Sequence, residues 1–395
     1  MDLAGKKIVL GLTGGVACFK AAELTRALGR AGASVQVVMT EAATHFITAI
    51  TMQALSNQTV YTDQWDARIA NNMAHIDLTR NADAVVIAPC SADFMSKLAH
   101  GTCDDLLSTL CLARPSGLPL LIAPAMNVEM WQNPATQRNV AQLKADGIII
   151  LGPDAGAQAC GEIGMGRMLE AEQLLELVVA SFQPKVLAGK HVLITAGPTF
   201  EPIDPVRGIT NLSSGKMGYA MARAAQEAGA HVMLVSGPTA LKTPGGVQRI
   251  DILSAQQMHD AVMANIDGQD VFIAVAAVAD WRVANAREQK LKKGSGGMPQ
   301  LAFEQNPDIL ALVAALPNKP YCVGFAAESE DLLRYGKAKR EKKSIPLLVG
   351  NLGPKTFGLD QNELILFDDQ GHKNFPRAEK QQLARQLITE IARRL

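Results

Sequence analysis

KKIVLGLTGG, residues 6–15, is the stretch that decides the fold, because an apolar run here ends in a pair of glycines. The run Ile8–Leu12 is typical of a buried strand. Residues 17–31 have helical character, and SVQVVMT, residues 34–40, is typical of a second strand. A strand, a glycine turn, a helix and a second strand are the usual start of a doubly wound parallel sheet. The stretch therefore predicts a Rossmann-like α/β domain.

The turn Thr13-Gly14-Gly15-Val16 has two interpretations. It would present backbone N–H groups at the start of a helix, which is a ready site for a phosphate. The alternative is a purely structural tight turn. The spacing GxGxxG is missing, so a dinucleotide is not indicated.

Three more apolar runs extend the predicted sheet, at residues 83–90, 118–127 and 147–152. Ligands of such sheets bind at the carboxyl ends of the strands. Thr40 ends the second strand, Ser91 follows the run 83–90, and Asn127 ends the run 118–127. We therefore expect these residues to converge on one crevice, together with the glycine-rich stretch that begins at residue 152.

Two domains are expected for a chain of 395 residues. KHVLITAGPT, residues 190–199, restarts the strand and glycine-turn pattern of residues 7–15. Residues 171–182 are typical of an amphipathic helix, and Pro184 and Gly189 bracket a short linker. We predict a first domain at 1–182, a linker at 183–189 and a second doubly wound domain at 190–395.

The composition excludes several classes of protein. The formal net charge is zero, which gives no support for a nucleic-acid surface, and no apolar run is long enough to span a membrane. The six cysteines include no CxxC pair and no disulfide-like spacing. This argues against a zinc site and favours the reducing cytoplasm.

The stretch GPDAGAQACGEIGMGRM, residues 152–168, holds five glycines, one cysteine and little that favours a helix or a strand. So many glycines allow the backbone to approach a ligand closely, but an interdomain linker has the same composition. His75, in NNMAHIDL, is equally open, since a solitary histidine is more often a surface or capping residue than a catalyst.

Five segments of the first half resemble the family of flavin-dependent cysteine decarboxylases: GLTGGVA, MAHIDL, APCSADFMSKLAHGTCDDLLS, PAMNVEMW and ACGEIGMGRM. The resemblance implies a flavodoxin-like, FMN-binding domain that assembles as a trimer, with its active site at the subunit contact. It implies FMN at Gly14, Gly15, Thr40 and Ser91, His75 as the base, Asn127 as the group that grips the substrate carboxylate, and Cys160 as the acid.

The residue types suit that chemistry. Loss of CO2 from a cysteinyl carboxylate leaves an unstabilised carbanion, so an electron sink such as flavin is needed. His75 would help to remove a proton, and Cys160 would return one, because the pKa of a thiol lies close enough to neutrality. A glycine-rich flap would close Cys160 over the substrate, with Glu162 and Arg167 as secondary candidates for shaping it.

The second half offers a separate set of polar groups. Asp280 ends an apolar run at 270–281, and Ser213 or Ser214 would cap a helix that follows SSGK, a sequence without the full P-loop spacing. Lys290 lies in a lysine and glycine segment, where a lid over an anion and a solvated loop are both possible. Lys339 and Lys343 lie one helical turn apart, which suits a triphosphate or ordinary solubility.

Further segments resemble phosphopantothenate–cysteine ligases: AGPTFEPIDPVRGITNLSSGKMG, AAVADWR, KLKK, NPDIL, GFAAE and KAKREKK. The resemblance implies an acyl-cytidylate intermediate, CTP as the nucleotide and Mg2+, without specifying metal ligands. Trp281 departs from the family, in which an aromatic hydroxyl residue is common. The implied residues are Asn211 at the acyl intermediate, Asp280, Pro307, Asp308, Ile309, Leu310 and Phe325 around the cytidine, and Lys290, Lys339 and Lys343 at the phosphates.

The whole chain thus resembles the bacterial bifunctional enzymes of coenzyme A biosynthesis. Their substrates are 4′-phosphopantothenate, cysteine and CTP, and trimeric first domains with dimeric second domains would build a dodecamer. One alternative is a working ligase with an inert flavin domain, against which the presence of both His75 and Cys160 argues. Another is a flavin-binding regulatory protein, but such relatives often carry acidic tails and lack the ligase.

Overall fold

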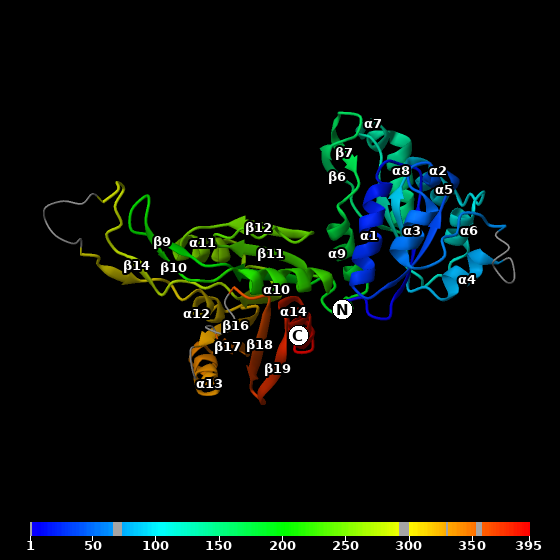
Figure 1. Cartoon of the computed structure of the whole chain (residues 1–395). Helices are drawn as coiled ribbons and strands as arrows, with labels where there is room; N and C mark the ends of the chain where they lie inside the picture. Colours follow the sequence, from blue (N-terminus) through cyan, green and yellow to red (C-terminus); the bar gives the residue numbers. More distant parts are fainter. Residues whose placement is uncertain (1, 66–72, 292–299, 329–330, 353–357) are drawn as a thin grey trace. The chain divides into compact units, whose positions relative to one another are not determined.

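The computed structural model describes residues 2–65, 73–291, 300–328, 331–352 and 358–395. The chain divides into two compact units, Met1–Phe182 and Gln183–Leu395 (Figure 1). Each unit contains its own sheet, and the two are described separately. Among the described residues, no helix is both long enough and apolar enough to cross a membrane.

The sheet of the first unit has five parallel strands in the order β2-β1-β3-β4-β5. This is the flavodoxin-like variant of the doubly wound fold, so the predicted fold class is confirmed. The order reverses between β1 and β3, and ligands of such sheets bind at this switch point. The strands are β1 Lys7–Leu12, β2 Ser34–Met39, β3 Ala84–Cys90, β4 Leu120–Pro124 and β5 Ile149–Ile150.

Helices cover both faces of this sheet and bury two apolar clusters. One cluster includes residues of α1, α3 and α9, and the other includes residues of α5, α6 and α8. The helices are α1 Cys18–Arg30, α2 Glu41–Thr44, α3 Ala49–Ser56, α4 Ala74–Arg80, α5 Ala92–His100, α6 Leu106–Ala113, α7 Val128–Gln132, α8 Pro134–Ala145 and α9 Ala171–Ser181.

The glycine-rich stretch 152–168 is a β-hairpin, so the expectation that it contains no strand is wrong. The strand β6, Asp154–Ala157, pairs antiparallel with β7, Ile163–Arg167. The glycines allow this because β7 lies directly against the chain before α7. A Cβ on Gly166, whose φ is +130°, would lie 2.5 Å from the carbonyl oxygen of Met126, and a Cβ on Gly164 would lie 2.6 Å from Val128.

The sheet of the second unit has eight strands in the order β12-β11-β8-β13-β16-β17-β18-β19. The first six are parallel and follow the Rossmann order, with β8 as the first strand and the reversal between β8 and β13. The last two form an antiparallel hairpin at one edge. The strands are β8 His191–Ala196, β11 His231–Ser236, β12 Val247–Asp251, β13 Val271–Ala274, β16 Tyr321–Glu328, β17 Leu347–Leu352, β18 Gln361–Asp368 and β19 Gly371–Glu379.

Two helix layers also cover this second sheet. Residues of α10 and α14 share one apolar cluster, and residues of α11 and α12 share the other. Leu187, in the predicted linker, is buried in the first of these clusters. The helices are α10 Lys216–Glu227, α11 Ala255–Asn265, α12 Ile309–Ala314, α13 Leu332–Lys343 and α14 Lys380–Ala392.

The second unit also contains two small antiparallel strand pairs. One pairs β9 Phe200–Pro202 with β10 Gly208–Thr210, and the other pairs β14 Trp281–Val283 with β15 Phe303–Gln305.

Two local predictions for this unit are wrong. The strand predicted at 270–281 ends at Ala274, although Val275 and Ala277 still donate their N–H groups to the carbonyl oxygens of Thr195 and Gly197 at the end of β8. Asp280 therefore lies in a loop beyond the strand. Neither Ser213 nor Ser214 caps α10, whose N-cap is Gly215 with a φ of +76°.

Candidate active sites

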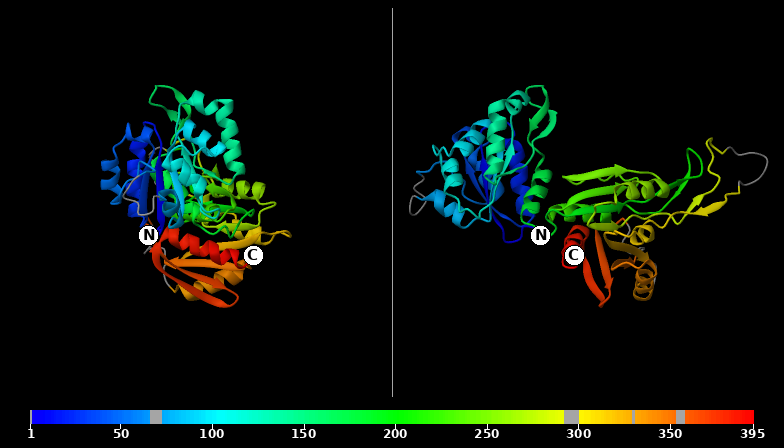
Figure 2. Two further views of the ribbon diagram at one scale, coloured as in Figure 1. Left: turned by 90° about the vertical axis from the view of Figure 1, so that its right-hand side faces the viewer. Right: turned by 180° about the vertical axis from the view of Figure 1, so that it is seen from behind.

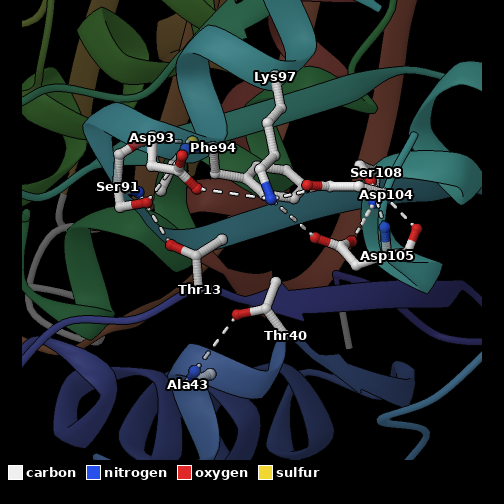
Figure 3. A network of polar contacts seen from close by, with 11 residues as sticks. Thr13, Thr40, Ala43, Ser91, Asp93, Phe94, Lys97, Asp104, Asp105 and Ser108 are labelled. Carbon is white, nitrogen blue, oxygen red and sulfur yellow. Dashed lines mark hydrogen bonds and ion pairs between the residues drawn. The ribbon is translucent and has the colours of Figure 1, made fainter. Parts of the chain in front are cut away.

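The predicted phosphate site of the first unit lies where β1 and β3 end. Thr13 is buried there and makes two hydrogen bonds through its hydroxyl. It donates to the carbonyl oxygen of Pro89 at 2.9 Å. It accepts from the backbone N–H of Ser91 at 2.9 Å (Figure 3). These bonds fix the two strand ends against each other at the switch point.

The glycine turn after Thr13 has the features of an anion site. Within the described part of the chain, the N–H groups of Gly14 and Val16 donate to no backbone acceptor, whereas the Gly15 N–H hydrogen-bonds to the Cys18 thiol. A Cβ on Gly14 would lie 2.7 Å from the Cβ of Ala42, so a side chain there would need the neighbouring segment to shift, whereas a Cβ on Gly15 would face open space. Free donors at the start of the 13-residue helix α1 suit the phosphate of FMN.

Thr40 and Ser91 are both helix caps at strand ends. The Thr40 hydroxyl accepts from the N–H of Ala43 at 3.3 Å, and the Ser91 hydroxyl accepts from the N–H of Phe94 at 3.2 Å (Figure 3). Each hydroxyl keeps its own proton for donation to a ligand. The four residues predicted to bind FMN thus lie at the carboxyl ends of β1, β2 and β3, as expected for a doubly wound sheet.

Cys160 lies in the turn of the β6–β7 hairpin and meets Asn127 there. The backbone N–H of Met126 donates to Gly166 at 3.0 Å, and that of Val128 donates to the Gln158 side chain at 2.9 Å. These bonds hold the hairpin against the chain before α7. The structure therefore brings together two of the predicted catalytic residues, which are 33 positions apart in the sequence.

Glu162 joins these two residues. Its Oε2 accepts from the Asn127 amide at 3.2 Å and from the Cys160 thiol at 3.4 Å. The Asn127 side chain also caps α7, because its Oδ1 accepts from the N–H of Met130 at 2.9 Å. Cys160 and Glu162 are exposed, so this cluster is open to a ligand.

His75 does not join this cluster within the same chain. It lies in the first turn of α4, and both views in Figure 2 and the view in Figure 1 place α4 well apart from the β6–β7 hairpin of this unit. Among the described residues, which exclude 66–72 just before it, His75 forms a hydrogen bond only through its backbone carbonyl oxygen, which accepts from the Thr79 hydroxyl. Within this unit, the predicted base and the predicted acid therefore lie apart.

The cysteines fall into two groups. Burial raises the pKa of Cys18 to about 11 and that of Cys111 to about 12. Cys103 and Cys160 are exposed, and all six thiols are unpaired. Cys160 therefore combines accessibility with a polar environment, as a proton donor requires.

In the second unit, two neighbouring pockets lie at the switch point between β8 and β13. They share Ala276, Val278, Asp280, Phe325 and Lys339. One also includes the start of α10, and the other includes Lys343 and residues 307–310. The structure thus brings together eight residues of the predicted nucleotide site, namely Asp280, Pro307, Asp308, Ile309, Leu310, Phe325, Lys339 and Lys343.

The two lysines of α13 are not isolated charges. Lys343 donates to both oxygens of Asp308, at 2.7 and 2.9 Å, and Lys339 donates to Glu328 at 3.4 Å. Burial acts to raise the pKa of Asp308, but hydrogen bonds from Lys343 and from the Ala311 N–H outweigh it and lower that pKa. Asp308 also caps α12, so this ion pair fixes the pocket wall next to the start of that helix.

Asn211 and Lys290 lie outside the lining of both pockets. Asn211 still touches the site, because its amide donates at 2.9 Å to the carbonyl oxygen of Ala277, which lines the first pocket. Lys290 is exposed and precedes residues 292–299, so the predicted flap at Lys290 and 294–300 lies largely outside the described residues.

The chain next to Lys290 is anchored by a buried acid that sequence reasoning missed. Asp204 accepts from the N–H of Leu291 at 3.1 Å, and Arg207 donates to the Leu291 carbonyl oxygen at 2.9 Å. The side-chain hydrogen bonds from Arg207 hold the pKa of Asp204 below its usual value, against the effect of burial. The sequence signal that could have revealed this anchor is DPVR, residues 204–207, in which an acid and a base lie three positions apart.

Two lysines that were not among the predicted site residues lie at the other end of the first pocket, Lys216 of the SSGK segment and Lys380. Lys216 pairs with Asp360 at 2.7 Å, and the buried Lys380 donates to the Leu359 carbonyl oxygen. Burial, and secondarily the charge of Lys216, lower the pKa of Lys380. No sequence motif includes Lys380. No group of three or more potential metal ligands occurs among the residues with described positions.

Comparisons with known proteins match both halves of the chain. The family described as "Flavoprotein" matches residues 1–183, and the family described as "DNA/pantothenate metabolism flavoprotein C-terminal domain" matches residues 187–395. These matches cover the chain almost completely. They begin and end close to the two compact units.

Full-length relatives resemble the whole chain. The "Coenzyme A biosynthesis bifunctional protein CoaBC" of Vibrio vulnificus is 49% identical over 394 residues, which cover 98% of each chain. The protein of the same name from Escherichia coli K12 is 46% identical over 401 residues, with 100% of this chain and 98% of the relative covered. A solved structure, the C-terminal domain of CoaBC, is 37% identical with a TM-score of 0.46 and covers 53% of this chain and 97% of its own.

Proposed function

The chain belongs to the family of bifunctional coenzyme A biosynthesis proteins, and from this premise we propose a two-step reaction for it. The second unit joins 4′-phosphopantothenate to cysteine through an acyl-cytidylate, converting CTP to CMP and pyrophosphate. The first unit then decarboxylates the resulting 4′-phosphopantothenoylcysteine to 4′-phosphopantetheine with FMN. The domain boundaries proposed for these activities are 1–182 and 190–395, with 183–189 between them.

The contact between the β6–β7 hairpin and the chain before α7 is the observation that most supports decarboxylation. Through this contact, the exposed Cys160 thiol and the Asn127 amide both donate to the same oxygen of Glu162. Those are the groups needed to hold a cysteinyl carboxylate and to return a proton after CO2 leaves. Asn127 would hold the substrate carboxylate, and Cys160 would donate the proton.

The glycine turn and the two caps would hold FMN. The N–H groups of Gly14 and Gly15 would bind its phosphate, with the hydroxyls of Thr40 and Ser91 as further donors. When bound, FMN supplies the reversible two-electron oxidation that makes loss of the carboxylate possible. His75 would take up a substrate proton, and it would do so in the site of a neighbouring copy.

Exposed apolar side chains near the glycine turn support assembly of the first unit. Val16 and Phe19 are 58% and 56% exposed, and Phe46 and Ile50 are 56% and 81% exposed. An apolar group of this kind is typical of a subunit contact. We propose that first units form trimers through such a contact, that second units form dimers, and that both together build a dodecamer in the cytoplasm.

The pockets of the second unit support the ligase step. Asp280, Phe325 and residues 307–310 would bind the cytidine, and Lys339 and Lys343 would face the phosphates. Asn211 would lie at the acyl intermediate. Lys290 and Mg2+ would screen the negative charge as the carboxylate of phosphopantothenate attacks the α-phosphorus.

Pyrophosphate release tests the ligase and its nucleotide. The purified chain is supplied with 4′-phosphopantothenate, Mg2+ and either CTP or ATP. Pyrophosphate should appear with CTP before cysteine is added, and only slowly with ATP. Equal rates with the two nucleotides would contradict CTP specificity, and no release with either would contradict the ligase.

A further inference from the structure

Glu162 is the point at which the two proposed catalytic donors of the first unit meet. A single oxygen, Oε2, accepts from the Asn127 amide at 3.2 Å and from the Cys160 thiol at 3.4 Å. Asn127 is the group proposed to bind the substrate carboxylate. A carboxylate of the protein itself thus makes the hydrogen bond that the substrate's carboxylate would make.

The orientation of the Asn127 amide is fixed by a second bond. Its Oδ1 accepts from the N–H of Met130 at 2.9 Å, so the amide nitrogen has to point away from α7 and toward the hairpin. Glu162 is brought there by the hairpin turn, in which the N–H of Gln158 donates to the Glu162 carbonyl oxygen at 2.8 Å. The pairing of amide and carboxylate is therefore set by two local hydrogen bonds, one at the start of α7 and one in the hairpin turn.

We propose that Glu162 is a positioning residue that occupies the carboxylate site on Asn127 until substrate displaces it. The inference rests on the proposed decarboxylase function. When the substrate's carboxylate reaches Asn127, two negative charges cannot share that amide favourably, so Glu162 moves off it. The thiol of Cys160 keeps Glu162 as its acceptor and stays directed into the site.

This arrangement makes substrate and product unequal competitors for the site. The substrate carries a carboxylate and has to displace Glu162, whereas 4′-phosphopantetheine has none and leaves the contact between Glu162 and Asn127 in place. Removing the charge of Glu162 should therefore strengthen substrate binding and leave product binding nearly unchanged. An effect on general hairpin stability would move both affinities together.

The test compares FMN-loaded wild type and Glu162→Gln as full-length proteins. Anaerobic rapid mixing gives the apparent Kd of 4′-phosphopantothenoylcysteine from the concentration dependence of flavin bleaching. Titration gives the Kd of 4′-phosphopantetheine from the flavin spectrum. We expect substrate to bind about 3- to 10-fold more tightly to Glu162→Gln, with a product Kd within about twofold of wild type, as for loss of one exposed charge-assisted hydrogen bond.

Two further variants separate position from charge. Glu129→Gln removes a charge from an exposed residue of α7 two positions after Asn127, and it should leave the ratio of the two affinities unchanged. Glu162→Asp keeps the charge but shortens the side chain, so its ratio should shift in the same direction as that of Glu162→Gln. An unchanged ratio in both Glu162 variants would overturn the inference, and a wild type that releases no CO2 would instead contradict the proposed function.

Discussion

Ser91 donates its backbone N–H to the side-chain hydroxyl of Thr13 at 2.9 Å, and this bond joins the chain beyond β3 to the chain beyond β1. It lies at the switch point of the first sheet, directly before the glycine turn proposed to bind phosphate. Thr13 is buried and also donates to Pro89. The hydroxyl thus sets the spacing of the two loops that would enclose FMN.

Thr13→Val should weaken both this junction and the binding of FMN. The substitution keeps the side-chain shape but leaves the Ser91 N–H without its acceptor, while the Pro89 carbonyl oxygen keeps only the Thr13 backbone N–H at 3.2 Å. Leaving a buried polar group unpaired costs about 1–3 kcal/mol. We expect the FMN Kd to rise on the order of tenfold in a flavin titration. Thr13→Ser keeps the hydroxyl and should stay close to wild type, and equal loss in both variants would contradict the role of the hydroxyl.

Cys160→Ala should separate CO2 release from completion of the reaction. Without the proton donor, the variant should release CO2 but accumulate an enethiol that lacks two hydrogen atoms of 4′-phosphopantetheine, which mass spectrometry detects. Cys103→Ala is the matched control, because Cys103 is the other exposed thiol. Normal conversion to 4′-phosphopantetheine by Cys160→Ala would show that another group donates the proton.

Asp204→Asn should impair the ligase and spare the decarboxylase. Asp204 accepts the Leu291 N–H and the Arg207 guanidinium, so the variant loosens the chain beside Lys290. We expect CTP-dependent pyrophosphate release to fall about tenfold, which corresponds to a loss of about 1.4 kcal/mol of transition-state stabilisation, because Lys290 is held less firmly at the phosphates. CO2 release from added 4′-phosphopantothenoylcysteine should persist. A parallel loss of both activities would indicate misfolding rather than loss of an anchor.

The same carboxylate predicts a pH dependence of stability. Its pKa is lower in the folded protein than the usual value of 3.8. A group with a lowered folded pKa stabilises the fold above its unfolded pKa, and this contribution is lost as the pH falls toward the folded pKa. Thermal unfolding of the wild type below pH 3.8 should therefore be steeper in pH than that of Asp204→Asn. Identical pH profiles would contradict the contribution of Asp204.

Lys343→Gln should weaken nucleotide binding more than its single charge suggests. Lys343 pairs with both oxygens of Asp308, so the variant removes the ion-pair partner of a carboxylate in the wall of the second pocket, which keeps only the Ala311 N–H as a hydrogen-bond donor. We expect the CTP Kd to rise about 3- to 10-fold, and the double variant with Asp308→Asn to recover part of that loss. Additive effects of the two substitutions in calorimetry would show that the ion pair does not act as a unit.

Much of the fold could be predicted because each sheet begins with an apolar strand that ends in a glycine turn. In the second unit, the predicted residues Asp280, Phe325 and Lys339 do lie around shared pockets. Parallel strands place their carboxyl ends at one edge of a sheet, so polar residues after different strands come together there. The position of the site can therefore be predicted from the order of strands and polar residues alone, without knowledge of the side-chain contacts.

The features that could not be predicted depend on contacts between distant segments. The hairpin at 154–167 forms because Gly164 and Gly166 fit against residues 126–128, and no local pattern reveals that partner. The acceptor role of Glu162 follows from the same contact. Lys380 reaches the first pocket from a helix more than 160 residues after Lys216, so sequence spacing carries no signal of their proximity.

The central claim is that one chain carries out both reactions, and cysteine labelled in its carboxyl carbon tests this most directly. The FMN-loaded protein is supplied with 4′-phosphopantothenate, labelled cysteine, CTP and Mg2+, and labelled CO2 and pyrophosphate are measured together. We expect labelled CO2 in equal amount to pyrophosphate, and none when CTP is omitted. Pyrophosphate without labelled CO2 would contradict the claim, as would labelled CO2 that appears without CTP.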